Sequence, residues 1–95
     1  MVEPRFDPLI HAPYRLRICA MLSQAESVEF GEILERCGLS KSALSKHLSQ
    51  LVDVGYVAES AIVRAGRSRQ LLTLTAAGRE SYAGHRAALQ QILDD

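Results

Sequence analysis

Residues 31–69 constrain the fold of this chain most strongly, because turn-forming residues divide them into short helical patterns and a hairpin. Gly38 is well placed for the left-handed conformation that ends a helix, and Ser40 can cap the amides of the next one. Gly55 stops that second helix, and an arginine-rich hairpin follows it. The two predicted helices are Gly31–Cys37 and Lys41–Val54.

The helix predicted at 41–54 has two different edges. Apolar residues at spacings of four, three and three predict a buried edge of Leu44, Leu48, Leu51 and Val54. The other edge carries short or cationic side chains and no acid until Asp53, whereas a merely solvated face would usually carry Glu–Lys pairs. Ser and Lys can bond base edges or phosphates in a major groove. We therefore expect DNA contacts from Ser40, Lys41, Ser42, Ser45, Lys46, His47 and Ser49.

His47 has three open interpretations. Beside Leu48 it can be a hydrogen-bonded packing residue, which we favour. Contact with a DNA phosphate is the second interpretation. A pH switch is the third, because histidine titrates near neutrality.

The residues from 64 to 69 form a second candidate DNA surface. β-forming stretches at Tyr56–Val63 and Gln70–Thr73 flank this sequence, which has the composition of a hairpin tip. Strand alternation should put Arg67 and Arg69 on one side of the ribbon, where guanidinium groups suit phosphates or a narrow minor groove. A charged edge that only prevents aggregation is the alternative. The expected DNA contacts here are Arg64, Arg67, Ser68 and Arg69.

The formal net charge is zero, which predicts little bulk attraction to DNA. The charges are nevertheless separated along the chain. Residues 27–35 contain three acids and no base, whereas residues 41–69 contain five bases and two acids. An acidic docking face for another protein is therefore an alternative function. Its residues would be Glu29, Glu32 and Glu35.

Further elements complete the predicted fold. Asp7 and Pro8 predict a first helix, Pro8–Ser23, which Pro13 either kinks or restarts at His11–Ala12, with Arg15 and Arg17 facing outward. Val28 and Phe30 alternate around Glu29 and suit a very short strand. Thr75 caps a last helix, from Ala76 to about Leu93. The resulting order, α-β-α-α-β-β-α, is mainly helical with a small antiparallel β hairpin, in a single domain over residues 1–95.

Composition excludes several other classes. An apolar fraction of 47% is ordinary for a globular domain, and no apolar run approaches the about 20 residues that cross a bilayer. The N-terminus lacks the pattern of a signal peptide, so we expect a cytoplasmic protein. Cys19 and Cys37 are isolated, which predicts two buried structural thiols without a disulfide or a zinc site. Redox or metal sensing by these cysteines is the alternative. We expect no enzyme and no cofactor, because His11, His47 and His85 are scattered over three predicted helices.

Four segments carry a resemblance to a known family: LIHAPYRLRICAMLSQ, LSKSALSKHLSQLVDVGYV, RAGRSRQLLTLT and TAAGRESY. With them the chain resembles winged helix-turn-helix regulators, similar to the small MarR-like and ArsR-like bacterial repressors. The resemblance implies that helix 41–54 enters the major groove, that the wing at 64–69 contacts the backbone or minor groove, and that the protein is a homodimer. Two departures are the missing cysteine pair of ArsR-type metal sensors and the missing longer terminal helices that shape an effector pocket in MarR proteins. A small-molecule effector is therefore not indicated.

Dimerisation also follows from the apolar residues of the last helix, which recur near coiled-coil spacing. The competing explanation is packing of this helix onto its own domain. We expect the terminal helices 8–23 and 76–93 to contribute to the dimer, with Tyr82, Leu89, Ile92 and Leu93 at the interface. The predicted function is a homodimeric repressor that binds double-stranded DNA, and the alternative is a winged-helix protein-interaction module without DNA binding.

Overall fold

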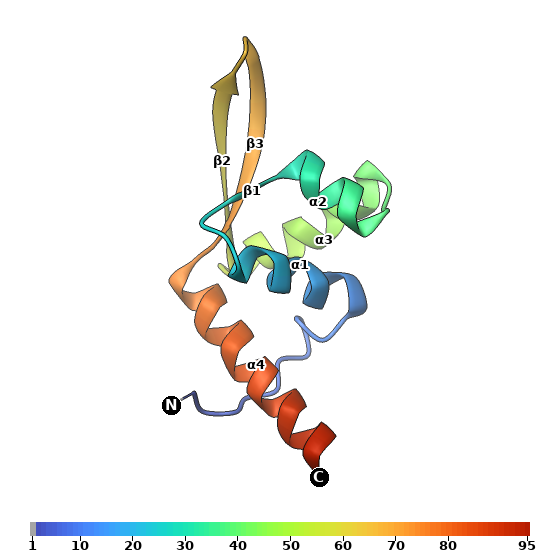
Figure 1. Cartoon of the computed structure of the whole chain (residues 1–95), viewed down its shortest axis with the longest axis vertical. Helices are drawn as coiled ribbons and strands as arrows, with labels where there is room; N and C mark the ends of the chain where they lie inside the picture. The colour runs from blue at the N-terminus through green and yellow to red at the C-terminus, as the bar shows by residue number, and fades with distance from the viewer. Residues whose placement is uncertain (1) are drawn as a thin grey trace.

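A computed structural model describes residues 2–95 and contains, within them, four helices and a three-stranded sheet (Figure 1). In chain order the elements are α1 (Pro13–Ser23), β1 (Val28–Glu29), α2 (Phe30–Cys37), α3 (Lys41–Asp53), β2 (Val57–Arg64), β3 (Arg67–Leu74) and α4 (Ala76–Asp94). This order confirms the predicted fold class, a mainly helical winged helix-turn-helix domain.

The first helix begins later than predicted. Asp7 does act as a cap, but only of an isolated turn, where its Oδ1 accepts hydrogen bonds from the N–H groups of Leu9 and Ile10 at 2.9 and 3.2 Å. Helix α1 starts at Pro13, whose missing N–H is not needed in a first turn, and Ala12 is its N-cap. The start at Pro8 was therefore wrong, and the alternative near His11–Ala12 is the one adopted.

The turn between α2 and α3 has the geometry that its residues predict. Gly38 has a φ of 67° and ends α2 in the left-handed conformation. The Oγ of Ser40 accepts a hydrogen bond from the N–H of Ala43 at 3.2 Å and caps α3. Leu44, Leu48 and Leu51 form the buried edge of α3. Val54 is 51% exposed, so its predicted burial was wrong, because the chain has already left the helix there.

The sheet has the order β1-β3-β2, and its pairings are antiparallel. The β2–β3 pairing runs from Val57 opposite Leu74 to Arg64 opposite Arg67. The connecting turn is therefore only Ala65-Gly66, shorter than the predicted tip, and both residues have a positive φ, of 52° and 74°. This hairpin, the wing, extends well beyond the helices (Figure 1).

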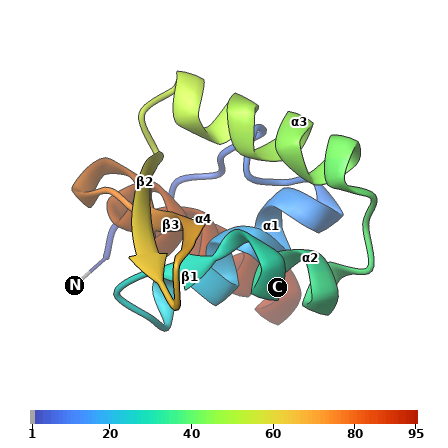
Figure 2. The same ribbon diagram turned by 90° about the horizontal axis from the view of Figure 1, so that it is seen from above.

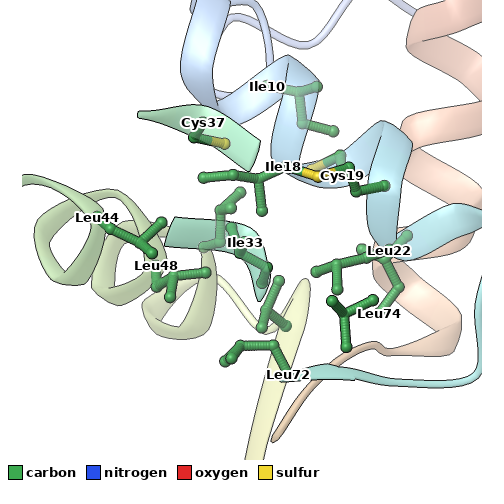
Figure 3. Close-up of a cluster of buried hydrophobic side chains, with 14 residues drawn as sticks. Ile10, Ile18, Cys19, Leu22, Ile33, Cys37, Leu44, Leu48, Leu72 and Leu74 are labelled. Carbon is green, nitrogen blue, oxygen red and sulfur yellow. The ribbon is translucent and has the colours of Figure 1, made fainter. Parts of the chain in front are cut away.

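The core lies where α1, α2 and α3 meet the inner face of the sheet (Figure 3). Ile18 of α1, Ile33 of α2 and Leu72 of β3 are fully buried in it. Cys19 and Cys37 are buried in the same cluster. Burial raises the pKa of both thiols, that of Cys19 to about 12, so both remain protonated near neutral pH.

Candidate nucleic-acid interface

The predicted edge of α3 lies on the surface of the molecule. Figure 2 shows α3 along one edge of the molecule. Within residues 2–95, neither Lys41 nor Lys46 forms an ion pair, so both ammonium groups are available to phosphates. The exposed residues of this edge are Ser40, Lys41, Ser42, Ser45, Lys46 and Ser49.

Arg15 holds α3 from the side of α1, a role that the sequence analysis missed. Its Nε donates a hydrogen bond to the carbonyl of Leu9 at 2.6 Å, and its Nη1 donates to Gln50 Oε1 at 2.8 Å. The same Nη1 lies 3.2 Å from His47 Nδ1. The prediction that Arg15 faces outward was therefore wrong, whereas Arg17 is exposed as expected. The spacing in the sequence did indicate an inward-facing Arg15, because this residue lies four positions before the buried Cys19 on the same face of the helix.

His47 is half-buried beside α1. Arginine can only donate, so His47 Nδ1 must accept the bond from Arg15, and the ring is neutral. Burial lowers the pKa of His47, and the charges of Arg15 and Lys46 lower it further. This geometry matches the packing role that we favoured. Contact of its other nitrogen with DNA stays a prediction.

The register of the wing places its three arginines on one face. Arg64 and Arg67 are directly paired, and Arg69 is paired with Ile62 two positions along. Paired residues point to the same side of a sheet and alternate residues share a face, so the three guanidinium groups lie on the same side. Ser68, paired with Val63, lies on the opposite face and is not brought together with the arginines.

The three arginines differ in their surroundings. Arg64 donates from Nη2 to Glu29 Oε1 of β1, in an ion pair that neutralises much of its charge. Arg69 is half-buried, and Arg67 is exposed near the tip. Among the residues that the structure describes, Arg67 has no ion-pair partner. Arg67 is therefore the wing side chain most available to a phosphate.

The acidic residues that suggested a docking face are mostly engaged within the domain. Glu29 pairs with Arg64, as described above. Glu32 pairs with Arg36 of the next helical turn, at 3.5 Å. The charge available to a basic partner on this face is correspondingly reduced.

The four predicted dimer residues fall into two groups. Tyr82 and Leu89 are half-buried, and Tyr82 packs against the core of its own domain, as the competing explanation expected. Ile92 and Leu93 are 60% and 77% exposed, on the last turns of α4, which project away from the body (Figure 1). The structure also places Phe6, 45% exposed, beside His85 of α4, with ring centroids 4.8 Å apart.

Residues 2–95 contain neither a membrane-spanning helix nor a cluster of metal-binding side chains. No helix among them is long and apolar enough to cross a membrane. No three histidine, cysteine or acidic side chains among them are grouped as a metal site requires.

Comparison with known proteins places this geometry in a family. Residues 14–93 match the family model described as Winged helix DNA-binding domain. An uncharacterised protein of Methanocaldococcus jannaschii is 27% identical over 77 residues, which cover 81% of this chain and 84% of that protein.

Solved structures share the fold. A transcriptional regulator homologue from Pyrococcus horikoshii superposes with a TM-score of 0.85 at 24% identity, covering 90% of this chain and 85% of that one. HlyU from Vibrio cholerae gives a TM-score of 0.64 at 26% identity, covering 92% and 86%. The exposed helix, the arginine-bearing wing and the family match over residues 14–93 lead to one conclusion: this chain belongs to the winged helix DNA-binding domain family.

Proposed function

We propose that this member of the family is a homodimeric repressor that inserts α3 into the major groove of its operator. The observation that carries the proposal is the acid-free, exposed edge of α3, with Lys41 and Lys46 unpaired among the described residues. Arg15 supports it, because its bonds to Gln50 and His47 fix α3 from the opposite side. A rigidly held helix loses little conformational freedom when it binds.

The wing would contact the DNA backbone or the minor groove next to the site of α3. Its three arginines share one face, and Arg67 is the freest of them. With a net charge of zero, the protein has little bulk attraction to DNA. Recognition must then depend on the fit of two domains to one site.

A second copy of this chain, in a homodimer, would supply the second DNA-binding domain. One domain makes few specific contacts, whereas two domains related by a two-fold axis contact two half-sites about 34–36 Å apart. The exposed Ile92 and Leu93 on the projecting end of α4 provide apolar surface for such a partner. Bound dimers would block a promoter and so repress transcription. Selection of bound sequences from random DNA tests the proposal, with a symmetric site as the expected result.

A protein-interaction module is the alternative function. The pairing of Glu29 and Glu32 with arginines of the same domain weakens the acidic face that it requires. Binding to fragmented genomic DNA at several salt concentrations separates the two functions. Absence of binding even at low salt would overturn the proposed one.

The wing arginines should differ in their effect on salt dependence. Arg67→Ala should weaken binding to all sequences and reduce the slope of log K against log salt by about one unit, because one phosphate contact is lost. Arg64→Ala should change the slope less, because Glu29 already neutralises this side chain. The measurement is a salt titration of binding to fragmented DNA. Equal slopes for wild type and Arg67→Ala would remove Arg67 from the phosphate contacts.

Substitutions on α3 should alter sequence preference. Ser45→Ala and Lys46→Ala remove exposed side chains, so the fold should be retained. If either residue contacts a base, discrimination at one operator position should fall by about 1–3 kcal/mol. Competition between the selected operator and its single-base variants measures this change. A uniform loss over all variants would instead make the residue a phosphate contact.

A further inference from the structure

An N-terminal segment, residues 3–12, crosses α4 and is bonded to it; we refer to it as the N-terminal strap (Figure 1). The N–H of Arg5 donates to the carbonyl of Gly84 at 2.9 Å. The N–H of Asp7 donates to His85 Nδ1, also at 2.9 Å. Glycine at position 84 eases the close approach of the two backbones. A Cβ there would lie 3.3 Å from the carbonyl oxygen of Glu3, which is a tight contact.

The strap is also bonded to the elements around α3. Oδ2 of Asp7 accepts a hydrogen bond at 2.7 Å from the hydroxyl of Tyr56, which lies between α3 and β2. The carbonyl of Leu9 accepts the bond from Arg15 Nε, and Arg15 also holds Gln50 of α3. Continuous hydrogen bonds therefore link α4, the strap and the proposed recognition helix.

Two histidines of this network have their protonation states imposed by their partners. A backbone N–H can only donate, so His85 Nδ1 must be unprotonated and its proton must lie on Nε2. His85 Nε2 lies 3.2 Å from His11 Nδ1, which must then accept. A second proton on His85 removes the acceptor of the Asp7 N–H, and a proton on His11 Nδ1 opposes the Nε2–H of His85.

The surroundings of His85 offer its charged form little stabilisation. The ring is 0% exposed and lies against the rings of Phe6 and His11. The carboxylate of Asp7 favours protonation, but its oxygens are already bonded to Leu9, Ile10 and Tyr56.

We propose that His85, bonded to Asp7 and His11 of the N-terminal strap, is a proton-sensitive lock on the strap, and that acidification opens the strap and weakens the hold on α3. The effect on α3 rests on the proposed DNA-binding function, whereas the opening of the strap does not. Opening removes the carbonyl of Leu9 from Arg15. Protonation of His47 removes a second acceptor from the same arginine.

The direction of the pH dependence follows from the histidines. Burial, then the proximity of His11, lowers the pKa of His85, while Asp7 raises it. The pKa of His47 is also lowered, by burial, Arg15 and Lys46. The open or unfolded state therefore binds more protons, so the closed state is favoured above the unfolded pKa of about 6.5 and is lost as the pH falls below it.

Amide exchange of the full chain, followed by NMR and corrected for intrinsic rates, tests the opening directly. At about pH 7.5 the N–H of Asp7 should be protected, and at about pH 5.5 its protection should fall by about tenfold or more while that of Leu44 in the core persists. Unchanged protection of Asp7 would overturn the proposal. If the amides of Asp7 and Leu44 lost their protection together, the proposal would also be overturned, because the whole domain would then be unfolding.

Two variants identify the groups that respond. His85→Asn places an amide oxygen where Nδ1 lies, so the strap should stay closed over this pH range. His11 is exposed, so His11→Gln should fold even if His85→Asn does not. This change removes the neighbour that lowers the pKa of His85, so acidification should favour the open state less and the opening should shift to lower pH. An unshifted opening would overturn the proposal.

Binding to fragmented genomic DNA at constant ionic strength tests the effect on α3. Wild-type affinity should fall by about tenfold between about pH 7.5 and pH 5.5. The affinity of His85→Asn, whose strap stays closed but which keeps His47, should fall less. Unchanged or stronger wild-type binding at the lower pH would overturn the link to α3. Absence of binding at neutral pH would overturn the proposed function, and the exchange measurement would still decide on the strap.

Discussion

Gly78→Ala is expected to destabilise the fold by about 3 kcal/mol or more, at the upper end of the cost of overpacking. A Cβ at this position would lie 2.1 Å from the carbonyl oxygen of Tyr56 and 2.8 Å from Cδ2 of Leu74. The closer contact is with backbone, which cannot rotate away. The same Tyr56 carbonyl accepts a hydrogen bond from the N–H of Thr75 at 3.0 Å, so moving it breaks a further bond. Urea denaturation followed by circular dichroism measures the loss.

Gly31→Ala is the matched control. Gly31 lies in α2, and a Cβ there has nothing within 4 Å. Because alanine favours helix more than glycine does, this variant should be stabilised by up to about 1 kcal/mol. If Gly78→Ala lowered the free energy of unfolding by no more than about 1 kcal/mol, the close contact between α4 and Tyr56 would be contradicted.

The contact at Gly78 matters because three functional elements meet there. Tyr56 follows α3 and precedes β2, whereas Thr75 joins β3 to α4. The Oγ1 of Thr75 accepts a bond from the N–H of Gly78 and donates one to the carbonyl of Gly55 at 2.6 Å. Both strands of the wing are therefore fixed at their base to the same turn of α4. A side chain at Gly78 would disturb the wing and α3 together.

Features of the fold that depend on neighbouring residues were predictable from the sequence. The glycine at 38, the serine at 40 and the threonine at 75 act within one helical turn, and each was expected to cap or stop a helix where it does. The leucines of α3 follow helical periodicity and were expected to be buried. The errors at Pro8 and Val54 both lie at helix ends, where an isolated turn or a cap competes with one more helical residue.

Features that depend on distant pairings were not predictable. His11 and His85 lie in separate parts of the chain and looked unrelated, yet their ring nitrogens are 3.2 Å apart because the strap crosses α4. The interpretations of Arg64 did not include its ion pair with Glu29, because this pair arises only when β1 joins β3. Local patterns therefore located the candidate DNA-binding residues, but not the contacts that position or neutralise them.

The double variant Ile92→Asp/Leu93→Asp should convert a dimer into a monomer. Both side chains are largely exposed in the single domain, so their replacement should leave its fold intact. In a dimer they would be buried, and an unpaired carboxylate in an apolar interface is strongly unfavourable. Sedimentation at several concentrations measures the change in association.

The same variant should lose about 100-fold or more in affinity for DNA that carries both half-sites, because the second domain is then no longer held at high effective concentration. Its affinity for a single half-site should be unchanged, since α3 and the wing are untouched. Gln91→Asp, an exposed change on the same turn of α4, controls for added negative charge near DNA. A double variant that remains dimeric would exclude the end of α4 as the interface, and equal losses on one and two half-sites would show that the charge, and not the dimer, was responsible.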